Sequence, residues 1–424
     1  MATEIFRIEG GTKLAGEIEV RGSKNAAAPI IAATLLTREP CTLHNVPRIE
    51  DVFRLLEILK SIGASVEWTG ERSVRIETKE VFPERMSFEE ARRVRMSVLL
   101  FGSLAARCDR FDMGHPGGCA IGARSIETHV DALEKLGIKI VKHEKHYEVD
   151  ATGRKAGKVV QREFSVTSTE DALMLAASLP GKTVIKIAAA EPHVEDLGRF
   201  LVAMGATIEG LGSHTLIVEG TTSLHGVEHE IIPDPIEAAT FLVLGAVTGS
   251  DLSVVHAREE HLELVLEKMR DFGVSFRIEP DRITVLPAKK LVSPGKVKAE
   301  LYPGIPTDAL SLFAVLATGA DGDTLIHEHL YEGRFNYIPE FEKMRVQATV
   351  LNPHQAVIHG PARLRGTTIK SFDLRAGAAL IIAALVAEGT TTIEDIYQVD
   401  RGYERIEERL QKIGAKIERI SRGE

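Results

Sequence analysis

A six-fold internal repeat is the feature that most constrains how this chain can fold. Each copy ends an amphipathic helical stretch at one marked residue, and a strand-like stretch follows it. The marked residues are Gly63, Gly137, Gly205, Gly273, Arg345 and Gly414. Consecutive marks lie 68 to 74 residues apart, a period too regular to arise by chance. Glycine after the last helical turn is the expected left-handed cap, so the pattern predicts six helix-to-strand transitions.

A period of this length indicates a β-α-β-α-β unit, because it is too long for one turn of a solenoid. With 424 residues the chain is too long for a single compact core, so the six units favour two domains of three repeats each. Pro233 and Pro235 interrupt a strand-like stretch where the chain would change domain. We therefore expect one domain over residues 22–232, and a second that combines residues 1–21, read as two short strands, with 233–424.

Composition excludes several classes of protein. A net charge of -9 with a pI near 6.0 argues against general binding to nucleic acid or anionic membranes. The three cysteines form no CxxC pair, which is typical of the reducing cytoplasm. The longest apolar run, residues 376–387, is shorter than the roughly 18 residues that a membrane span needs. The histidine pairs 143/146 and 327/329 lack matching acidic or cysteine ligands, so we expect no metal and no cofactor.

Charged residues recur where the first helix of each repeat begins. Free N–H groups and the helix dipole attract anions at such positions. A plain capping role would explain Asp and Ser there but not Lys or Arg, because a cation opposes the dipole. The recurrence therefore predicts a site for a multiply anionic ligand. The segments that begin these helices include Ser23-Lys24-Asn25, Arg93-Val94-Arg95, Ser165-Val166-Thr167, Pro306-Thr307-Asp308 and Asp373-Leu374-Arg375.

A glycine-rich stretch from Gly114 to Arg124 carries Cys119. Glycines let a backbone approach a ligand closely. A thiol near a cation loses its proton easily and can serve as an acid, a base or a nucleophile. The alternative is an ordinary glycine-rich connection with a cysteine of the core.

Together these motifs resemble the UDP-N-acetylglucosamine 1-carboxyvinyltransferase family of enolpyruvyl transferases along the whole chain. The resemblance implies two inside-out α/β barrel-like domains of three repeats each. It also implies transfer of the enolpyruvyl group of phosphoenolpyruvate to the 3-hydroxyl of UDP-N-acetylglucosamine, with release of phosphate, as the first committed step of peptidoglycan synthesis. The matching segments are Gly22 to Ala26, Pro116 to Arg124, Pro306 to Asp308, Gly333 to Phe335, Asp373 to Ala376 and Asp400 to Glu407.

The resemblance also implies roles for individual residues. Lys24, Arg124 and Arg401 would bind the donor's phosphate, and Arg334 and Arg375 its carboxylate. Cys119 would protonate the donor and bond to the inhibitor fosfomycin, Asp308 would take the proton of the acceptor hydroxyl, and Asn25 would orient the sugar. The remaining contacts to the acceptor would come from Arg95, Ser165, Val166, Thr167 and Leu330. No metal, cofactor or obligatory protein partner is implied.

Four positions depart from the family pattern, and they keep an alternative open. Thr167, Ala190, Pro235 and Gln398 stand where the family usually has Gly, Arg, Arg and His. The alternative is a related enolpyruvyl transferase that acts on a different nucleotide sugar. A shikimate-phosphate enzyme would share the fold but lacks the Pro-Gly-Gly-Cys loop. A sensor without activity would not be expected to keep the donor residues.

Overall fold

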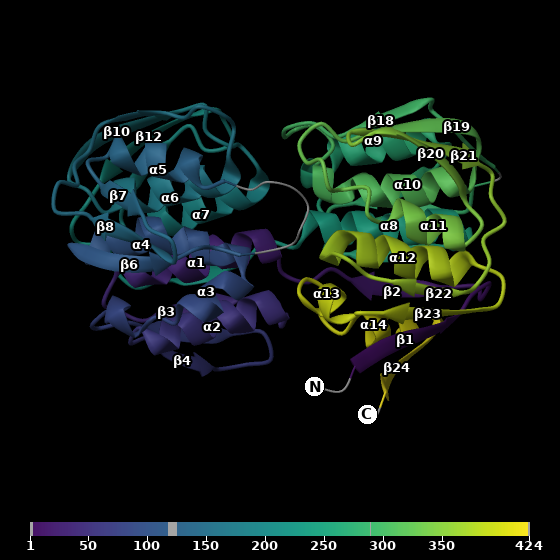
Figure 1. The fold of residues 1–424 in the computed structure, drawn as a ribbon, viewed down its shortest axis with the longest axis horizontal. Helices are drawn as coiled ribbons and strands as arrows, with labels where there is room; N and C mark the ends of the chain where they lie inside the picture. Colours follow the sequence, from purple (N-terminus) through teal and green to yellow (C-terminus); the bar gives the residue numbers. More distant parts are fainter. Residues whose placement is uncertain (1–2, 118–124, 289, 423–424) are drawn as a thin grey trace. The chain divides into compact units, whose positions relative to one another are not determined.

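The computed structural model describes residues 3–117, 125–288 and 290–422, and these divide into two compact units. The N-terminal unit comprises residues 22–117 and 125–232. The C-terminal unit comprises residues 3–21 together with the described residues from 233 to 422. Each unit has its own hydrophobic core. The chain therefore begins in one unit, passes through the other, and returns (Figure 1).

Three apolar helices form the centre of each unit. Their side chains are buried nearly all round; in α8, for example, every residue from Ile236 to Ala246 is buried. A helix that is hydrophobic on all sides must lie inside the protein. These inner helices are α1 (Lys24–Ala33), α4 (Leu100–Arg107) and α6 (Val166–Ala177) in the N-terminal unit, and α8 (Pro235–Thr248), α10 (Leu310–Thr318) and α12 (Leu374–Val386) in the C-terminal unit.

The second helix of each repeat is shorter or amphipathic and has an exposed face. In α2, for example, Val52 and Leu55 are buried while Glu57 and Lys60 are exposed. These outer helices are α2 (Glu50–Ser61), α5 (Glu127–Glu134), α7 (Pro192–Ala203), α9 (Glu263–Asp271), α11 (Ile338–Lys343) and α14 (Ile406–Lys412). Two short helices, α3 (Phe88–Arg93) and α13 (Tyr397–Asp400), complete the set. No helix in the described part of the chain is long and apolar enough to cross a membrane.

The described residues form six small sheets around the inner helices, three in each unit, so the predicted inside-out α/β fold is confirmed (Figure 1). In the N-terminal unit their strand orders are β13-β3-β5-β4, β6-β8-β7 and β11-β12-β10-β9. The strands are β3 (Cys41–His44), β4 (Ser65–Trp68), β5 (Val74–Glu77), β6 (Arg110–Gly114), β7 (Lys139–Lys142), β8 (His146–Asp150), β9 (Lys158–Val160), β10 (Gly181–Lys186), β11 (Thr207–Glu209), β12 (Thr215–Gly220) and β13 (Glu228–Glu230).

The C-terminal unit follows the same plan, with the orders β15-β16-β14-β2, β17-β19-β21-β20 and β22-β23-β1-β24, and β18 beside β19. Its strands are β1 (Thr3–Glu9), β2 (Gly16–Glu19), β14 (Leu252–Val255), β15 (Ser275–Glu279), β16 (Arg282–Leu286), β17 (Leu291–Val292), β18 (Lys296–Lys298), β19 (Ala320–His327), β20 (Gln347–Asn352), β21 (Gln355–Gly360), β22 (Thr368–Lys370), β23 (Thr390–Glu394) and β24 (Lys416–Arg422).

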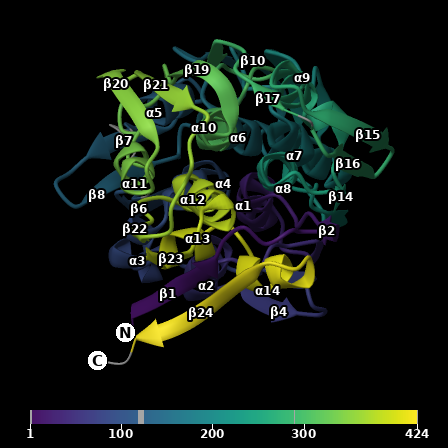
Figure 2. The same cartoon turned by 90° about the vertical axis from the view of Figure 1, so that its right-hand side faces the viewer.

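Among the described residues, every sheet except β6-β8-β7 has at least one strand more than the three that the sequence pattern predicts for a repeat, because a hairpin follows the outer helix. In the first repeat of the C-terminal unit, for example, β15 and β16 pair antiparallel. In the last repeat the strand that pairs with β24 comes from the start of the chain. There β1 lies between β23 and β24, with Ile5 opposite Ile420 and Phe6 opposite Ile393 (Figure 2). Strand β13 likewise closes the N-terminal unit by pairing with β3.

All six repeat marks adopt the predicted left-handed conformation. The φ angles are 113° at Gly63, 86° at Gly137, 114° at Gly205, 89° at Gly273, 76° at Arg345 and 100° at Gly414. Each mark donates to a carbonyl three residues earlier, and the next residue donates to one five residues earlier, as Arg345 N to Glu342 O and Val346 N to Phe341 O. This pair of hydrogen bonds is the Schellman motif that ends a helix.

We predict that Arg345→Gly stabilises the protein, because Arg345 is the only mark that pays the steric penalty of a Cβ atom at positive φ. Its side chain is exposed, so no packing is lost with it. The expected gain in the free energy of unfolding is about 0.5–1 kcal/mol, measured by denaturant unfolding. Gly414→Ala is the reverse control at an equivalent cap and should lower stability by a similar amount. A lower stability of Arg345→Gly would contradict this account.

Candidate active site

Three charged side chains of the C-terminal unit meet at the starts of two inner helices. Asp308 lies in a single 3-10 turn just before α10, Arg334 precedes α11, and Arg375 is the second residue of α12. The carboxylate of Asp308 bridges the two arginines: Oδ1 lies 2.5 Å from Arg334 Nη2, and Oδ2 lies 3.3 Å from Arg375 Nε. The structure therefore brings together three of the residues singled out in the sequence.

Buried neighbours hold the guanidinium of Arg375 in place. Its side chain is only 3% exposed, and its Nη1 donates to Tyr403 Oη at 3.4 Å. Tyr403 is in turn hydrogen-bonded to Thr240 at 2.8 Å. Asp234 Oδ2 lies 3.8 Å from Arg375 Nη2. Burial lowers the pKa of Arg375, but Tyr403, Asp234 and Asp308 outweigh burial and raise it, so the guanidinium keeps its charge.

Both arginines retain buried N–H groups without a hydrogen-bond acceptor among the described residues. These are Nη2 of Arg375 and Nε of Arg334. Buried donors are nearly always satisfied in proteins, and a guanidinium presents five of them in a fork that matches a carboxylate or phosphate. The arrangement therefore indicates a site prepared for an anion.

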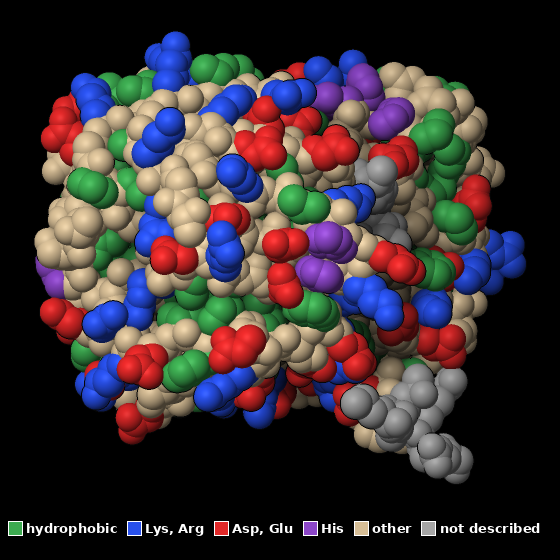
Figure 3. Space-filling model, turned by 60° about the vertical axis from the view of Figure 1, so that its left-hand side comes forward, with side chains coloured by type: hydrophobic (Ala, Val, Ile, Leu, Met, Phe, Trp, Pro, Cys, Tyr) green, Lys and Arg blue, Asp and Glu red, His purple; other side chains and the backbone are tan. Residues whose placement is uncertain are grey.

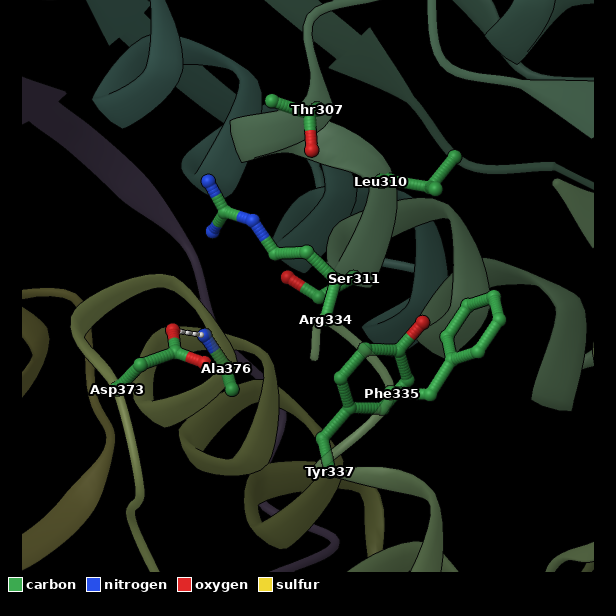
Figure 4. Close-up of a pocket in the computed structure, with 8 residues that line it drawn as sticks. All are labelled: Thr307, Leu310, Ser311, Arg334, Phe335, Tyr337, Asp373 and Ala376. Carbon is green, nitrogen blue, oxygen red and sulfur yellow. Dashed lines mark hydrogen bonds between the residues drawn. The ribbon is translucent and has the colours of Figure 1, made fainter. Parts of the chain in front are cut away.

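A small polar pocket opens beside Arg334, whose guanidinium extends into the space between Thr307 and Asp373 (Figure 4). Asp373 caps α12 by accepting from the backbone N–H groups of Arg375 and Ala376 at 2.9 and 2.8 Å. Burial lowers the pKa of Arg334, but Asp308, Asp373 and Glu328 together raise it. The pocket is lined by Thr307, Leu310, Ser311, Arg334, Phe335, Tyr337, Asp373 and Ala376.

Two further predicted residues lie in the C-terminal unit but contact other partners. Arg401, at the end of α13, donates through Nη1 to Gln398 Oε1 at 3.2 Å and is 7% exposed. Leu330 is half-buried, and its backbone N–H donates to Glu328 Oε1 at 2.8 Å. Buried Glu328 also accepts from the Thr307 hydroxyl, so it ties the Leu330 loop to the segment that carries Asp308.

In the N-terminal unit, Lys24 opens helix α1 immediately after the N-cap Ser23. A cation at this position opposes the helix dipole, and Asp51 compensates it with an oxygen 3.0 Å from Lys24 Nζ. The neighbouring Asn25 is half-buried. Arg95 begins the 3-10 helix that precedes α4 and donates to the backbone oxygen of Ser125 at 3.3 Å.

Ser165, Val166 and Thr167 form the N-terminus of α6, and all three are half-buried. Ser165 is the N-cap, and its hydroxyl accepts from Ser168 N at 3.4 Å. The Thr167 hydroxyl lies 3.1 Å from His129 Nε2 on α5. The three residues predicted to contact a nucleotide thus lie at the start of one helix, where backbone N–H groups favour an anion.

Cys119 and Arg124 lie outside the described residues. The other two cysteines are placed and do not look reactive. Cys41 is buried on β3, and Cys108 follows α4 and is partly buried. Burial raises the pKa of both thiols, which disfavours the nucleophilic thiolate.

A second group of buried acids lies on α6, beneath the Ser165 segment. Glu170 is 1% exposed, and its Oε1 has no hydrogen-bond partner among the described residues. Its burial, followed by the charges of Asp171 and Glu191, raises its pKa well above the usual value. The folded protein therefore binds a proton at Glu170 at pH values where the unfolded chain has released it.

This proton linkage predicts how stability depends on pH. Because the folded pKa of Glu170 is raised, stability falls as the pH rises from the unfolded pKa of about 4.3 towards the folded value. We predict that Glu170→Gln stabilises the protein at pH 8, by about 1.4 kcal/mol for each unit that folding raises the pKa of Glu170, with little change at pH 4.5. Thermal unfolding across this pH range tests it. Exposed Glu67→Gln makes the same change in charge and should have no effect.

Sequence reasoning missed several residues that hold the site together. Tyr403, Thr240 and Asp234 support Arg375, and His129 with Asp171 supports Thr167. Tyr403 and Asp234 lie inside motifs that were singled out, whereas His129 and Asp171 carry no local signal. Two departures from the family pattern have local roles: Pro235 occupies the first position of α8, where its missing N–H is harmless, and Gln398 is a partner of Arg401.

Comparisons with known proteins define the class first. The model of the EPSP synthase family, described as 3-phosphoshikimate 1-carboxyvinyltransferase, matches residues 8–410. The chain therefore belongs to this family of carboxyvinyl transferases. Among solved structures, the enolpyruvyl transferase NikO from Streptomyces tendae matches all of the chain and all of its own with a TM-score of 0.90 at 24% identity. EPSP synthase from Acinetobacter baumannii covers 99% of this chain and 100% of its own, with a TM-score of 0.75 at 18% identity.

Sequence relatives narrow the group within the family. UDP-N-acetylglucosamine 1-carboxyvinyltransferase of Methylacidiphilum infernorum is 43% identical over 98% of this chain and 99% of its own length. The proteins of the same name from Koribacter versatilis and Bradyrhizobium diazoefficiens are each 41% identical, over 98% and 99% of this chain and 96% and 99% of their own. The resemblance seen in the sequence motifs is confirmed.

Proposed function

We propose that the protein transfers the enolpyruvyl group of phosphoenolpyruvate to the 3-hydroxyl of UDP-N-acetylglucosamine and releases phosphate. In the cell this would be the first committed step of peptidoglycan synthesis, in the cytoplasm. The observation that carries the proposal is the pair of arginines bridged by Asp308, each with a buried N–H group that has no acceptor among the described residues.

The donor is a compact molecule with a phosphate and a carboxylate, and it requires several cations. Arg334 and Arg375 would bind the carboxylate through their buried donors, since a planar fork binds such a group with two hydrogen bonds. Binding would draw the two guanidiniums away from Asp308, which then has an oxygen available for the acceptor hydroxyl. Asp308 would accept that proton as the hydroxyl adds to C2 of the donor.

The remaining residues keep the roles that the resemblance implies. Lys24, Arg124 and Arg401 bind the phosphate, and Asn25 orients the sugar. Cys119 delivers a proton to C3 as the hydroxyl adds to C2, and C3 gives up a proton again when the bond from C2 to phosphate breaks, which restores the double bond in the product. Arg95, the α6 N-terminus from Ser165 to Thr167, and Leu330 contact the acceptor. The names of the relatives favour UDP-N-acetylglucosamine over the alternative of another nucleotide sugar.

Phosphate release with a panel of acceptors tests the proposal. We expect release from phosphoenolpyruvate with UDP-N-acetylglucosamine, and a product in which mass spectrometry finds the added enolpyruvyl group. UDP-glucose and UDP-N-acetylgalactosamine are the comparison acceptors. Faster turnover with one of these, or no turnover with any acceptor, would overturn the assignment.

Alkylation by fosfomycin gives a separate prediction about Cys119. We expect treated enzyme to carry one adduct at Cys119, whereas Cys41 and Cys108 remain unmodified because burial raises their pKa. Peptide mass spectrometry locates the adduct. Cys119→Asp should resist the inhibitor and keep part of its activity, since a carboxyl group can still deliver a proton. An adduct at Cys41 or Cys108 would contradict the prediction.

A further inference from the structure

A carboxylate, an imidazole and a hydroxyl form a continuous chain in the N-terminal unit, from the protein interior to the start of α6. Asp171 is completely buried on α6. Its Oδ1 accepts from Gly102 N at 2.9 Å and its Oδ2 lies 2.8 Å from His129 Nδ1. His129 Nε2 then lies 3.1 Å from the hydroxyl of Thr167.

The direction of the hydrogen bonds follows for an ionised Asp171 and a neutral imidazole. A carboxylate can only accept, so His129 donates through Nδ1, and the neutral ring has its lone pair at Nε2. Thr167 therefore donates its hydroxyl hydrogen to His129. Its oxygen is left with lone pairs only, so it can accept a hydrogen bond from a ligand but has no proton to give.

A purely structural role explains the hydrogen bonds of Asp171 but not the one between His129 and Thr167. The bonds of Asp171 to Gly102 and His129 tie α6 to α4 and α5 inside the core. Those bonds would be the same without a hydroxyl at position 167. Thr167 is instead half-buried, and it follows Ser165 and Val166 at the helix start that the proposed function assigns to the acceptor.

We propose that Thr167 is a specificity-determining residue for the acceptor, and that His129 and Asp171 are positioning residues that act through it. This inference rests on the proposed function. Thr167 Oγ1 accepts a hydrogen bond from an N–H or O–H group of the nucleotide sugar, and the buried pair fixes both its direction and its polarity. The pattern of the family has glycine at this position, so this hydroxyl adds a contact that the glycine cannot make.

The first test compares kinetic constants in variants of Thr167. Thr167→Val keeps the shape and removes the hydroxyl, and we expect the KM for UDP-N-acetylglucosamine to rise about 5–10-fold, in line with the loss of one hydrogen bond. The kcat and the KM for phosphoenolpyruvate should stay unchanged. Thr167→Ser should restore the wild-type KM. Thr128→Val is the matched control, because its hydroxyl on α5 bonds only Glu163 among the described partners.

The second test separates positioning from anchoring. His129→Asn keeps an N–H where Nδ1 lies, and so keeps the bond to Asp171, but it does not reach Thr167. We expect it to raise the KM for the acceptor, and to cause no further rise when combined with Thr167→Val. Independent effects that multiply in the double variant would show that His129 and Asp171 do not act through Thr167. An unchanged KM in Thr167→Val would overturn the specificity role.

The outcomes distinguish this inference from the proposed function. If the wild-type protein turns over and Thr167→Val is indistinguishable from it, the inference fails and the proposed function stands. If the wild-type protein shows no turnover, the proposed function fails. Calorimetric binding of UDP-N-acetylglucosamine to the same variants then tests whether Thr167 contacts the acceptor and whether His129 positions it. The expected loss of affinity is again about 5–10-fold.

Discussion

Asp308→Asn should abolish nearly all turnover while the protein still binds its donor. The substitution keeps the size of the side chain and removes its negative charge, and with the charge its ability to take a proton. A general base contributes about 10²–10⁴-fold to a rate, so we expect kcat to fall by about 10³-fold. The measurement is steady-state phosphate release with both substrates saturating.

Donor binding in the same variant gives the second half of this prediction. In the structure the charge of Asp308 occupies one N–H of Arg334 and one of Arg375. The neutral amide introduced by Asp308→Asn competes less well with the donor's carboxylate for these groups. Calorimetry should therefore show phosphoenolpyruvate binding as tightly as to the wild type, or more tightly.

A matched acid separates the chemistry from a general loss of charge. Asp321 lies on strand β19 of the same unit, is exposed, and pairs with Lys290 at 2.6 Å. Asp321→Asn should leave kcat unchanged. Wild-type kcat in Asp308→Asn would remove Asp308 from the chemistry, and loss of donor binding would show that its role is to shape the arginine pair.

The sequence predicted those parts of the fold that are encoded locally. The marked residues from Gly63 to Gly414 predict helix ends, because the left-handed residue and its two hydrogen bonds involve only residues that are close in the sequence. Arg345 shows the strength of the pattern, since it adopts φ 76° where its five counterparts are glycines. The pairing of β1 with β24, such as Glu9 with Lys416, joins residues 407 apart and has no periodic signal.

The candidate site shows the same division. Motifs identified Asp308, Arg334 and Arg375 as single residues, but not that one carboxylate bridges both arginines. Tyr403 and Thr240, 163 residues apart, support Arg375 through a contact that only the folded chain creates. Surface charge does not point to the candidate site, since Lys and Arg are interspersed with Asp and Glu on the face shown in Figure 3.

Arg375→Met should be the most destabilising single change in the site. The guanidinium is buried beside two carboxylates, Asp234 and Asp308, and Asp234 is only 4% exposed. Removing one partner of a buried ion pair leaves an uncompensated charge and costs about 3–5 kcal/mol. We expect a loss of this size in the free energy of unfolding, measured by denaturant titration, and loss of detectable donor binding.

Arg375→Lys tests whether charge alone is sufficient. Lysine keeps one positive charge but cannot contact Asp308 and Tyr403 together, as the planar fork does at 3.3 and 3.4 Å. We expect the KM for phosphoenolpyruvate to rise about 10–100-fold, the loss of one hydrogen bond to a charged group.

Exposed Arg277, which lies 3.9 Å from Glu279, provides the control for the stability of Arg375→Met. Arg277→Met should change the free energy of unfolding by less than about 1 kcal/mol.

A second substitution identifies the cause of the instability. Asp234 also caps α8 by accepting from the N–H groups of Ile236 and Glu237, and asparagine caps a helix about as well as aspartate. In the Arg375→Met background, Asp234→Asn should therefore recover part of the lost stability, because it removes the uncompensated charge and keeps the cap. In the wild-type background the same change should be destabilising. Equal effects in both backgrounds would show that Arg375 stabilises the unit by packing rather than by charge.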